Sequence, residues 1–200
     1  MTAETAEYTK PFDIFTEWMK EAEANEPNDP NGMALATVDA EGRPSLRMVL
    51  LKGWAEDGFR FFTNLTSRKG HDLEANQNVA LLFHWKSLRR QIRIEGSVSP
   101  VTTEEADEYF ASRPRGSRIG AWASKQSAPM EGRFEFEGRI AKYTTEYAVG
   151  EIPRPDFWSG FLVTPKRFEF WMDRPFRLHD RHQYDLTEDG TGWSVSTLYP

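Results

Sequence analysis

The run from residue 109 to residue 127, YFASRPRGSRIGAWASKQS, combines cations with hydroxyl, amide and small side chains. No carboxylate occurs between Ala111 and Met130, although like charges without a counter-charge repel one another. The run therefore predicts that an anion binds here, and a phosphorylated small molecule is the anion that we expect. Its four cations are Arg113, Arg115, Arg118 and Lys125.

Two further cation clusters precede this run. The segment RMVLLK, residues 47–52, reads as an apolar strand with Arg47 and Lys52 at its ends, and their separation predicts that they point to opposite faces of a sheet. Ser67 then begins a predicted helix whose first residues are Arg68 and Lys69. Free backbone N–H groups and the helix dipole favour an anion at that position. Together the two clusters predict a second phosphate site.

Tyr109, Arg113 and Ser117 form a candidate site of their own. Tyr109 and Arg113 are four residues apart, so they share one face of a helix, and Ser117 follows just beyond Pro114. A phenol, a guanidinium and a hydroxyl can all donate to one phosphate. The alternative is that Tyr109 belongs to the core and that Arg113 is an ordinary charge at a helix C-terminus.

Near the C-terminus, Arg177, His179 and Arg181 alternate with other residues in the segment PFRLHDRHQY. In a strand they would share one face, with Leu178 on the other. Potential cations on one face indicate a binding site. No second histidine or carboxylate stands at ligand spacing, so we expect no metal.

Antiparallel strands with a few intervening helices are the elements that would position these residues. The pattern of apolar residues predicts about seven or eight strands and four helices, which is typical of an α+β fold with a barrel-like sheet. The segment 130–147 also alternates like a strand, and helix is the preferred interpretation. The predicted strands are 33–38, 45–52, 59–63, 79–85, 90–101, 161–172, 176–184 and 193–198, and the predicted helices are 12–25, 67–76, 102–112 and 130–147.

Composition limits the class of protein. The chain has 200 residues, no cysteine and a net charge of -6, and residues 1–31 hold eight acids against two bases, so the rest of the chain is neutral. Disulfides and thiolate chemistry are excluded, and cations scattered through apolar strands argue against nucleic acid as a partner. No long apolar run predicts a membrane span or leader, so we expect a soluble, cytoplasmic protein. We expect an N-terminal helical or lid segment, 1–30, and one domain, 31–200.

Several separated motifs resemble those of the pyridoxamine 5'-phosphate oxidase family. The motifs RMVLLK, FFTNLTSRKG, the run 109–127, FWSGFLVTPKRFEFW and RLHDR occur in the order that the family has. The resemblance implies the FMN-binding split β-barrel, which is mostly antiparallel with flanking helices. It also implies an obligate homodimer with FMN in a cleft between the subunits.

The resemblance also assigns roles residue by residue. It implies that Arg177 and His179 are catalytic and lie against the reactive side of the substrate. The implied FMN-binding residues are Arg47, Met48, Val49, Leu50, Leu51, Lys52, Phe62, Thr63, Arg68, Lys69, Gln91, Gln126, Ser127, Trp171 and Arg181. The implied substrate-binding residues are Lys52, Tyr109, Arg113, Ser117, Arg177, Leu178, His179 and Tyr8.

Two segments depart from the family's pattern. Ala6 and Glu7 stand before Tyr8 where arginines are common, and Thr197 stands where the C-terminal motif usually has an arginine. Any lid role of the N-terminal segment therefore depends on Tyr8.

The implied activity is oxidation of pyridoxamine 5'-phosphate and pyridoxine 5'-phosphate to pyridoxal 5'-phosphate, the last step in making or salvaging this vitamin B6 form. Dioxygen is the implied acceptor, with hydrogen peroxide as a product and ammonia released from the amine. Two alternatives remain open at this stage. One is another FMN- or F420-dependent oxidoreductase on the same scaffold, and the other is a non-catalytic carrier of flavin or pyridoxal phosphate.

Overall fold

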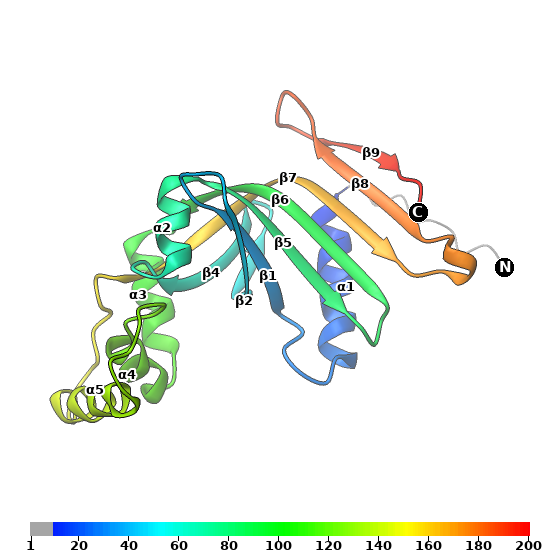
Figure 1. The fold of residues 1–200 in the computed structure, drawn as a ribbon. Helices are drawn as coiled ribbons and strands as arrows, with labels where there is room; N and C mark the ends of the chain where they lie inside the picture. The colour runs from blue at the N-terminus through cyan, green and yellow to red at the C-terminus, as the bar shows by residue number, and fades with distance from the viewer. Residues whose placement is uncertain (1–9) are drawn as a thin grey trace.

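The computed structural model of the chain describes residues 10–200 and is built on one curled antiparallel sheet (Figure 1). Nine strands are described: β1 (Gly32–Val38), β2 (Pro44–Leu50), β3 (Gly53–Ala55), β4 (Gly58–Asn64), β5 (Asn78–Trp85), β6 (Arg90–Pro100), β7 (Trp158–Met172), β8 (Asp180–Leu186) and β9 (Trp193–Thr197). The α-helices are α1 (Pro11–Asn25), α2 (Arg68–Ala75), α3 (Thr103–Ser112), α4 (Arg115–Ala123) and α5 (Arg133–Glu146), and one 3-10 turn, η1, covers Pro175–Arg177. The α+β class is confirmed.

The long strand β7 joins the two ends of this sheet. The strand order is β2-β1-β5-β6-β7-β4-β3, and β8 adds to β7 and carries β9. Along one edge of β7, the first half pairs with β4 and the second half pairs with β8. Along the opposite edge, β7 pairs with β6. The register with β6 shifts at Gly96, where a Cβ atom would lie 2.2 Å from the Thr164 carbonyl oxygen. Only glycine allows the two strands to approach so closely at this irregularity.

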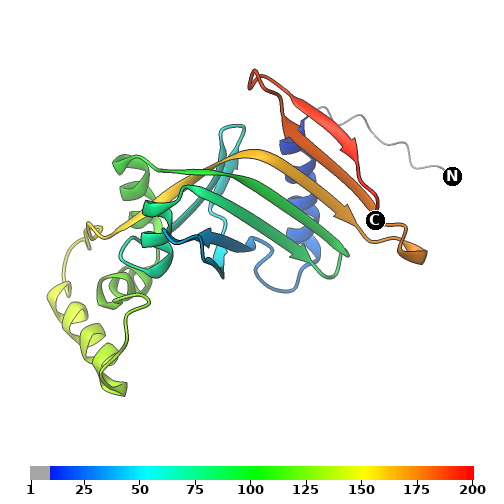
Figure 2. The same ribbon diagram turned by 45° about the horizontal axis from the view of Figure 1, so that its top comes forward.

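Helix α1 fills the inner face of the curled sheet (Figure 2). It begins at Pro11, a residue whose fixed φ suits a first turn, and it buries Phe12, Phe15 and Met19 in the main core. The Phe15 ring makes edge contacts with Phe59 and Phe83. The sheet is therefore held in its curl by aromatic packing against one helix.

Helices α3, α4 and α5 form a second, smaller core at one end of the molecule, whereas β8 and β9 lie at the other end (Figures 1 and 2). Phe110, Ile119, Ile152 and Trp158 are its buried members. The predicted start of the helix 102–112 is confirmed, because Thr102 caps α3: its hydroxyl accepts from the Glu105 N–H at 3.1 Å. The preferred helix over 130–147 is confirmed by α5, but α4 was not predicted, because Pro114 and two glycines obscured its pattern.

Two predictions about strands are wrong. Residues 176–179 are not strand: Phe176 and Arg177 have φ values of 58° and 61°, and β8 begins only at Asp180. Consequently, no strand alternation places Arg177 and His179 on one face with Arg181. Strand β2 ends at Leu50, so Lys52 lies after the strand and not on the face opposite Arg47. Among residues 10–200, no helix is long and apolar enough to cross a membrane.

Candidate active site

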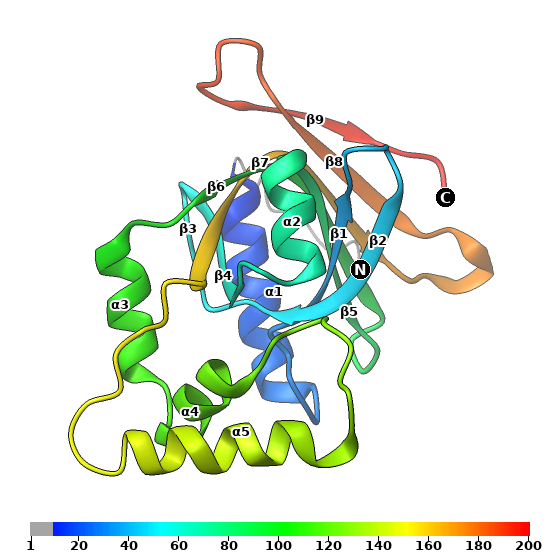
Figure 3. The ribbon, with the colours of Figure 1, turned by 60° about the vertical axis from the view of Figure 1, so that its left-hand side comes forward.

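An open cavity of about 630 Å³ lies between the strand ends of β2 and β4 and helices α2, α3 and α4. Figure 3 shows these helices below and beside the β1–β2 edge. The volume is within the range of small-molecule sites. Most of the residues assigned to FMN and to a substrate phosphate are among those that line it: Met48, Val49, Leu50, Lys52, Phe62, Thr63, Lys69, Tyr109, Arg113, Ser117 and Gln126.

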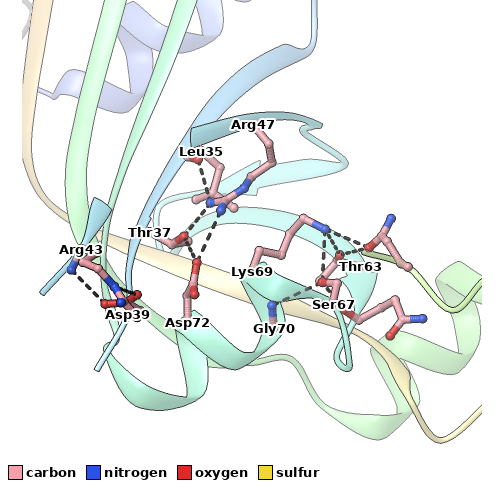
Figure 4. Close-up of polar contacts among 12 residues, drawn as sticks. Leu35, Thr37, Asp39, Arg43, Arg47, Thr63, Ser67, Lys69, Gly70 and Asp72 are labelled. Atoms are coloured by element: carbon pink, nitrogen blue, oxygen red, sulfur yellow. Dashed lines mark hydrogen bonds and ion pairs between the residues drawn. The ribbon is translucent and has the colours of Figure 1, made fainter. Parts of the chain in front are cut away.

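Lys69 is a buried cation of this cavity with only neutral partners. Its side chain emerges from the first turn of α2, and the residue is 8% exposed. Its ammonium donates to Gln126 Oε1 at 2.8 Å, to Thr63 Oγ1 at 3.1 Å and to Ser67 Oγ at 3.3 Å (Figure 4). Burial, with a smaller contribution from nearby Arg47, lowers the pKa of Lys69 to about 8. A bound anion would reverse this cost.

The start of α2 is built for such an anion. Ser67 caps the helix by accepting from the Gly70 N–H, and Gly70 is required because a Cβ atom would lie 1.9 Å from the Leu65 carbonyl oxygen. Lys69 of this first turn lines the cavity, and the free backbone N–H groups of a helix start favour an anion beside it. Arg68 is exposed.

Arg113 is the second cation of the cavity. It is the C-cap of α3, one residue beyond the last helical residue. The prediction that Arg113 and Tyr109 share a helical face is therefore wrong in that Arg113 is not helical, although both residues line the cavity. Its guanidinium lies over the Trp158 ring, 4.8 Å from the centroid, and its buried Nη1 atom has no hydrogen-bond partner. Burial lowers the pKa of Arg113. A donor left unpaired beside an open cavity indicates a ligand acceptor.

Two kinds of wall enclose the cavity. On one side Phe62 stacks on Tyr109 with ring centroids 4.0 Å apart and on Trp158 at 5.6 Å. On the other side α4 presents only small side chains, at the three- and four-residue spacing of one helix face. These are Ser117, Gly120, Ala121 and Ser124. The small face leaves room for a planar ligand beside the aromatic stack.

The other cations of the run 109–127 do not line this cavity. Arg115 donates to the carbonyl oxygens of Tyr147 and Gly150, and Lys125 pairs with Glu135 at 3.2 Å. The four cations therefore do not form one anion site: Arg113 lines the cavity, and Arg118, whose Nε atom is buried without a hydrogen-bond partner, does not. Ser127, with a φ of 72°, lines a neighbouring hollow next to Gln126.

A second cluster lies on the outer face of the sheet, far along the strands from the cavity. Gln91 pairs with Trp171 across β6 and β7, and Trp171 pairs with Arg181 across β7 and β8. These three side chains line a hollow of about 230 Å³. Arg181 donates to Glu169 Oε1 at 2.7 Å and to the Tyr199 carbonyl oxygen at 2.9 Å. Glu169 therefore fixes the direction of the Arg181 guanidinium.

His179 extends this second cluster. Its ring lies 4.8 Å from the Trp171 ring, and its Nδ1 atom lies 3.0 Å from Asp173 Oδ1. Arg177 and Leu178 are exposed on the same turn. The structure thus groups the residues assigned to catalysis with Gln91, Trp171 and Arg181, and not with the cavity of the same chain.

Some assigned residues lie elsewhere, and some lining residues were missed. Leu51 is 2% exposed in the main core, and Tyr8 lies outside the described residues. Asn64 and Trp158 line the cavity; both lie in motifs quoted for the family resemblance, but no role was assigned to them. Asn64 was detectable in principle as an Asx turn before the Ser67 cap, because its Oδ1 accepts from the Thr66 N–H at 2.8 Å.

Comparison with known proteins gives one family. Residues 19–147 match the family model described as pyridoxamine 5'-phosphate oxidase, and residues 158–200 match that of the pyridoxine 5'-phosphate oxidase C-terminal dimerisation region. The chain belongs to the pyridoxamine 5'-phosphate oxidase family. The dimerisation region contains β7, β8 and β9, and with them most of the second cluster.

Individual relatives agree with this membership. The chain is 61% identical to the pyridoxine/pyridoxamine 5'-phosphate oxidase of Chelativorans sp. (strain BNC1), over 96% of this chain and 91% of that protein. It is 62% identical to the enzyme of that name from Rhodospirillum rubrum, over 95% and 96% of the two chains.

Solved structures share the fold. PhzG from Burkholderia lata 383, solved with tetrahydrophenazine-1-carboxylic acid, superposes with a TM-score of 0.90 at 29% identity, covering 98% of this chain and 95% of that one. An FMN-binding protein from Nostoc punctiforme related to pyridoxamine 5'-phosphate oxidase superposes with a TM-score of 0.79 at 16% identity, covering both chains completely. The split-barrel fold expected for the family is confirmed.

Proposed function

We propose that this protein is an FMN-dependent oxidase that converts pyridoxamine 5'-phosphate and pyridoxine 5'-phosphate to pyridoxal 5'-phosphate. The observation that carries the proposal is the unbalanced charge of the cavity. Among the described residues, no carboxylate lies within ion-pair distance of Lys52, Lys69 or Arg113. A cofactor and a substrate that each carry a phosphate would supply the missing negative charge.

FMN fits the donor set of the cavity. Lys69, Arg68 and the free N–H groups of α2 suit its phosphate, because a buried ammonium with neutral partners gains most from a dianion. The side chains of Thr63 and Gln126 are hydrogen-bonded to each other and to Lys69. We assign Thr63 and Gln126 to the polar edge of the flavin ring system and the residues of β2 to its apolar edge. When bound, FMN accepts the two electrons removed from the substrate and passes them to dioxygen.

The protein is a homodimer, and we infer that each site is shared between subunits. Leu50 lines the cavity, whereas Arg181 lines the separate hollow of the second cluster, so the residues assigned to FMN do not meet within one chain. The outer face that joins them is apolar at β2, where Leu46 is 67% and Met48 68% exposed. A twofold axis through this face would bring the second cluster of one subunit to the cavity of the other.

In this arrangement the chain's own residues bind and orient the substrate. The substrate phosphate is bound by Lys52, Arg113, Tyr109 and Ser117. Arg177 and His179 of the second subunit contact the substrate ring on the side of the carbon that is oxidised. The Arg174 N–H donates to His179 Nδ1, and the Asp173 carboxylate lies beside the same atom, so both hold the imidazole in place for proton transfer. Positioning and charge are the protein's contribution to rate.

The experiment is to purify the protein, record its visible spectrum, add pyridoxamine 5'-phosphate in air, and measure aldehyde and peroxide together. The proposal predicts bound flavin and equal amounts of pyridoxal 5'-phosphate and hydrogen peroxide. A flavoprotein that takes up no oxygen with this substrate would instead be a carrier. One that oxidises only an unphosphorylated or a carboxylated substrate would be a different oxidase on this scaffold.

Cytoplasmic location is proposed on the sequence alone. Fractionation of cells that express the native gene checks it, with activity expected in the cytoplasmic fraction.

A further inference from the structure

Beneath the start of α2, Thr37 and Asp72 form a buried network with Arg47, and no role above explains these two residues. Thr37 of β1 is fully buried and Asp72 of α2 is 5% exposed. Both contact Arg47 of β2 from the interior side of the sheet (Figure 4). We propose that Asp72 and Thr37 are positioning residues that aim Arg47 at the phosphate of FMN; the inference rests on the proposed function.

The contacts join three elements through one guanidinium. Arg47 Nη1 donates to Thr37 Oγ1 at 2.6 Å and to the Leu35 carbonyl oxygen at 3.1 Å. Arg47 Nη2 lies 3.4 Å from Asp72 Oδ2. The Thr37 hydroxyl donates to that same carboxylate oxygen at 2.6 Å. Three of the five Arg47 N–H groups are thus used, and the one on Nε and one on Nη2 have no partner among the described residues and are left for a ligand.

Charge explains why Arg47 needs such a holder. Arg47, Arg68 and Lys69 are close enough to repel, since Arg68 contributes to lowering the pKa of Arg47 and Arg47 to lowering that of Lys69. Burial is the larger cause in both cases, and Asp72 opposes it at Arg47. Without Asp72 and Thr37, an arginine at this place would turn toward solvent, away from the other two cations.

Positioning and simple charge predict opposite results for one substitution. If Asp72 is only a counter-charge, removing it makes the region more positive and tightens the binding of a phosphate. If Asp72 positions Arg47, removing it loosens the guanidinium and weakens that binding. Riboflavin lacks the phosphate, so its affinity reports the ring site alone.

The experiment titrates FMN and riboflavin into apoprotein and follows the quenching of flavin fluorescence. We expect Asp72→Asn and Thr37→Val each to weaken FMN about tenfold and to leave riboflavin affinity unchanged. Thr37→Ser keeps the hydroxyl and should bind FMN like wild type. After Arg47→Met, the further change Asp72→Asn should have no additional effect on FMN.

Asp39→Asn is the matched control. Asp39 pairs with Arg43 in the exposed turn after β1 (Figure 4), so this variant loses an arginine–carboxylate pair away from the cavity and should keep the FMN affinity. If Asp72→Asn does not fold, the FMN affinities of Thr37→Val and Thr37→Ser test the same inference, because only the first variant loses the hydroxyl that contacts Arg47.

Tighter FMN binding by Asp72→Asn, or an equal loss of FMN and riboflavin affinity, would overturn the inference and leave the proposed function standing. A wild-type apoprotein that binds neither flavin would contradict the proposed function, and the inference with it.

Discussion

The cavity and the outer face of β6, β7 and β8 are both rich in arginine and lysine, but only the outer face balances its charge. On that face Arg93 lies 2.8 Å from Glu169, Arg167 lies 2.5 Å from Asp185, and Arg181 also pairs with Glu169. In the cavity, Lys69 and Arg113 have no carboxylate partner among the described residues. The charge of the outer face is balanced within the chain, whereas that of the cavity is balanced only with an anionic ligand.

The difference shows where the chain gives up stability for function. A buried cation without a counter-charge is costly to the folded state, and the lowered pKa values of Lys69 and Arg113 record that cost. Several arginines elsewhere pair with acids, as Arg60 pairs with Asp57 and Glu105. Among the described residues, Lys69 and Arg113 thus differ from Arg60 in being buried beside an open cavity with no acid.

The largest expected effect is on FMN binding. Lys69→Met removes the buried ammonium, and we expect FMN affinity to fall about 100-fold, close to 2.7 kcal/mol. Fluorescence titration of apoprotein measures it. Lys86→Met, on the exposed turn between β5 and β6, is the control and should bind FMN like wild type; equal affinities of the two variants would remove Lys69 from the phosphate site.

Arg113→Ala should affect the substrate more than the chemistry. We expect KM for pyridoxamine 5'-phosphate to rise about 30-fold while kcat changes less than about threefold, because the phosphate contact is made in the ground state and the transition state alike. Steady-state oxygen uptake measures both constants. Arg115→Ala, two residues away but bonded to carbonyl groups near the end of α5, should leave KM unchanged. A fall in kcat at constant KM would refute the assignment.

Stability should respond with opposite signs in the two regions. Glu169→Gln leaves Arg93 and Arg181 facing each other without their carboxylate, and we expect unfolding free energy to fall by about 1–2 kcal/mol. Lys69→Met removes an unpaired buried charge and should stabilise the apoprotein. Urea denaturation of both apoprotein variants checks this, and destabilisation of the same size in both would abolish the distinction between the regions.

The smallest effect is a pH dependence of FMN affinity. Lys69 in the free protein has a pKa of about 8, and a bound phosphate dianion would raise it. Affinity should therefore change little around pH 7 and decline as the pH rises through 8, by about tenfold from pH 7 to pH 9. Lys69→Met should abolish the decline. An affinity that rises over this range in the wild type would have the wrong sign for this lysine.

Local patterns in the sequence predicted most of the fold. Alternating apolar residues marked the strands, and Thr102 with Glu105 marked the start of α3. The turn at Phe176 and Arg177 could not be predicted, since non-glycine residues rarely take positive φ and only the surrounding structure imposes it. Helix α4 was missed because its small residues give little apolar periodicity. The same small residues leave room in the cavity.

The site was predictable only in part, for a related reason. Cations are visible in a sequence, but their partners are not: Lys125 and Arg115 looked like Arg113 until the structure showed Glu135 and two carbonyl groups beside them. The division of the site into two clusters was likewise beyond reach from residue spacing, because it depends on which strands are neighbours across the sheet.

A crystal structure of the dimer with FMN and pyridoxal 5'-phosphate bound tests the central claim most directly. The account predicts phosphate oxygens about 3 Å from Lys69 Nζ and from the Arg113 guanidinium, with Arg181 of the partner subunit beside the flavin. Phosphates bound instead at the paired arginines of β6 to β8, with Lys69 and Arg113 still unpartnered, would contradict it.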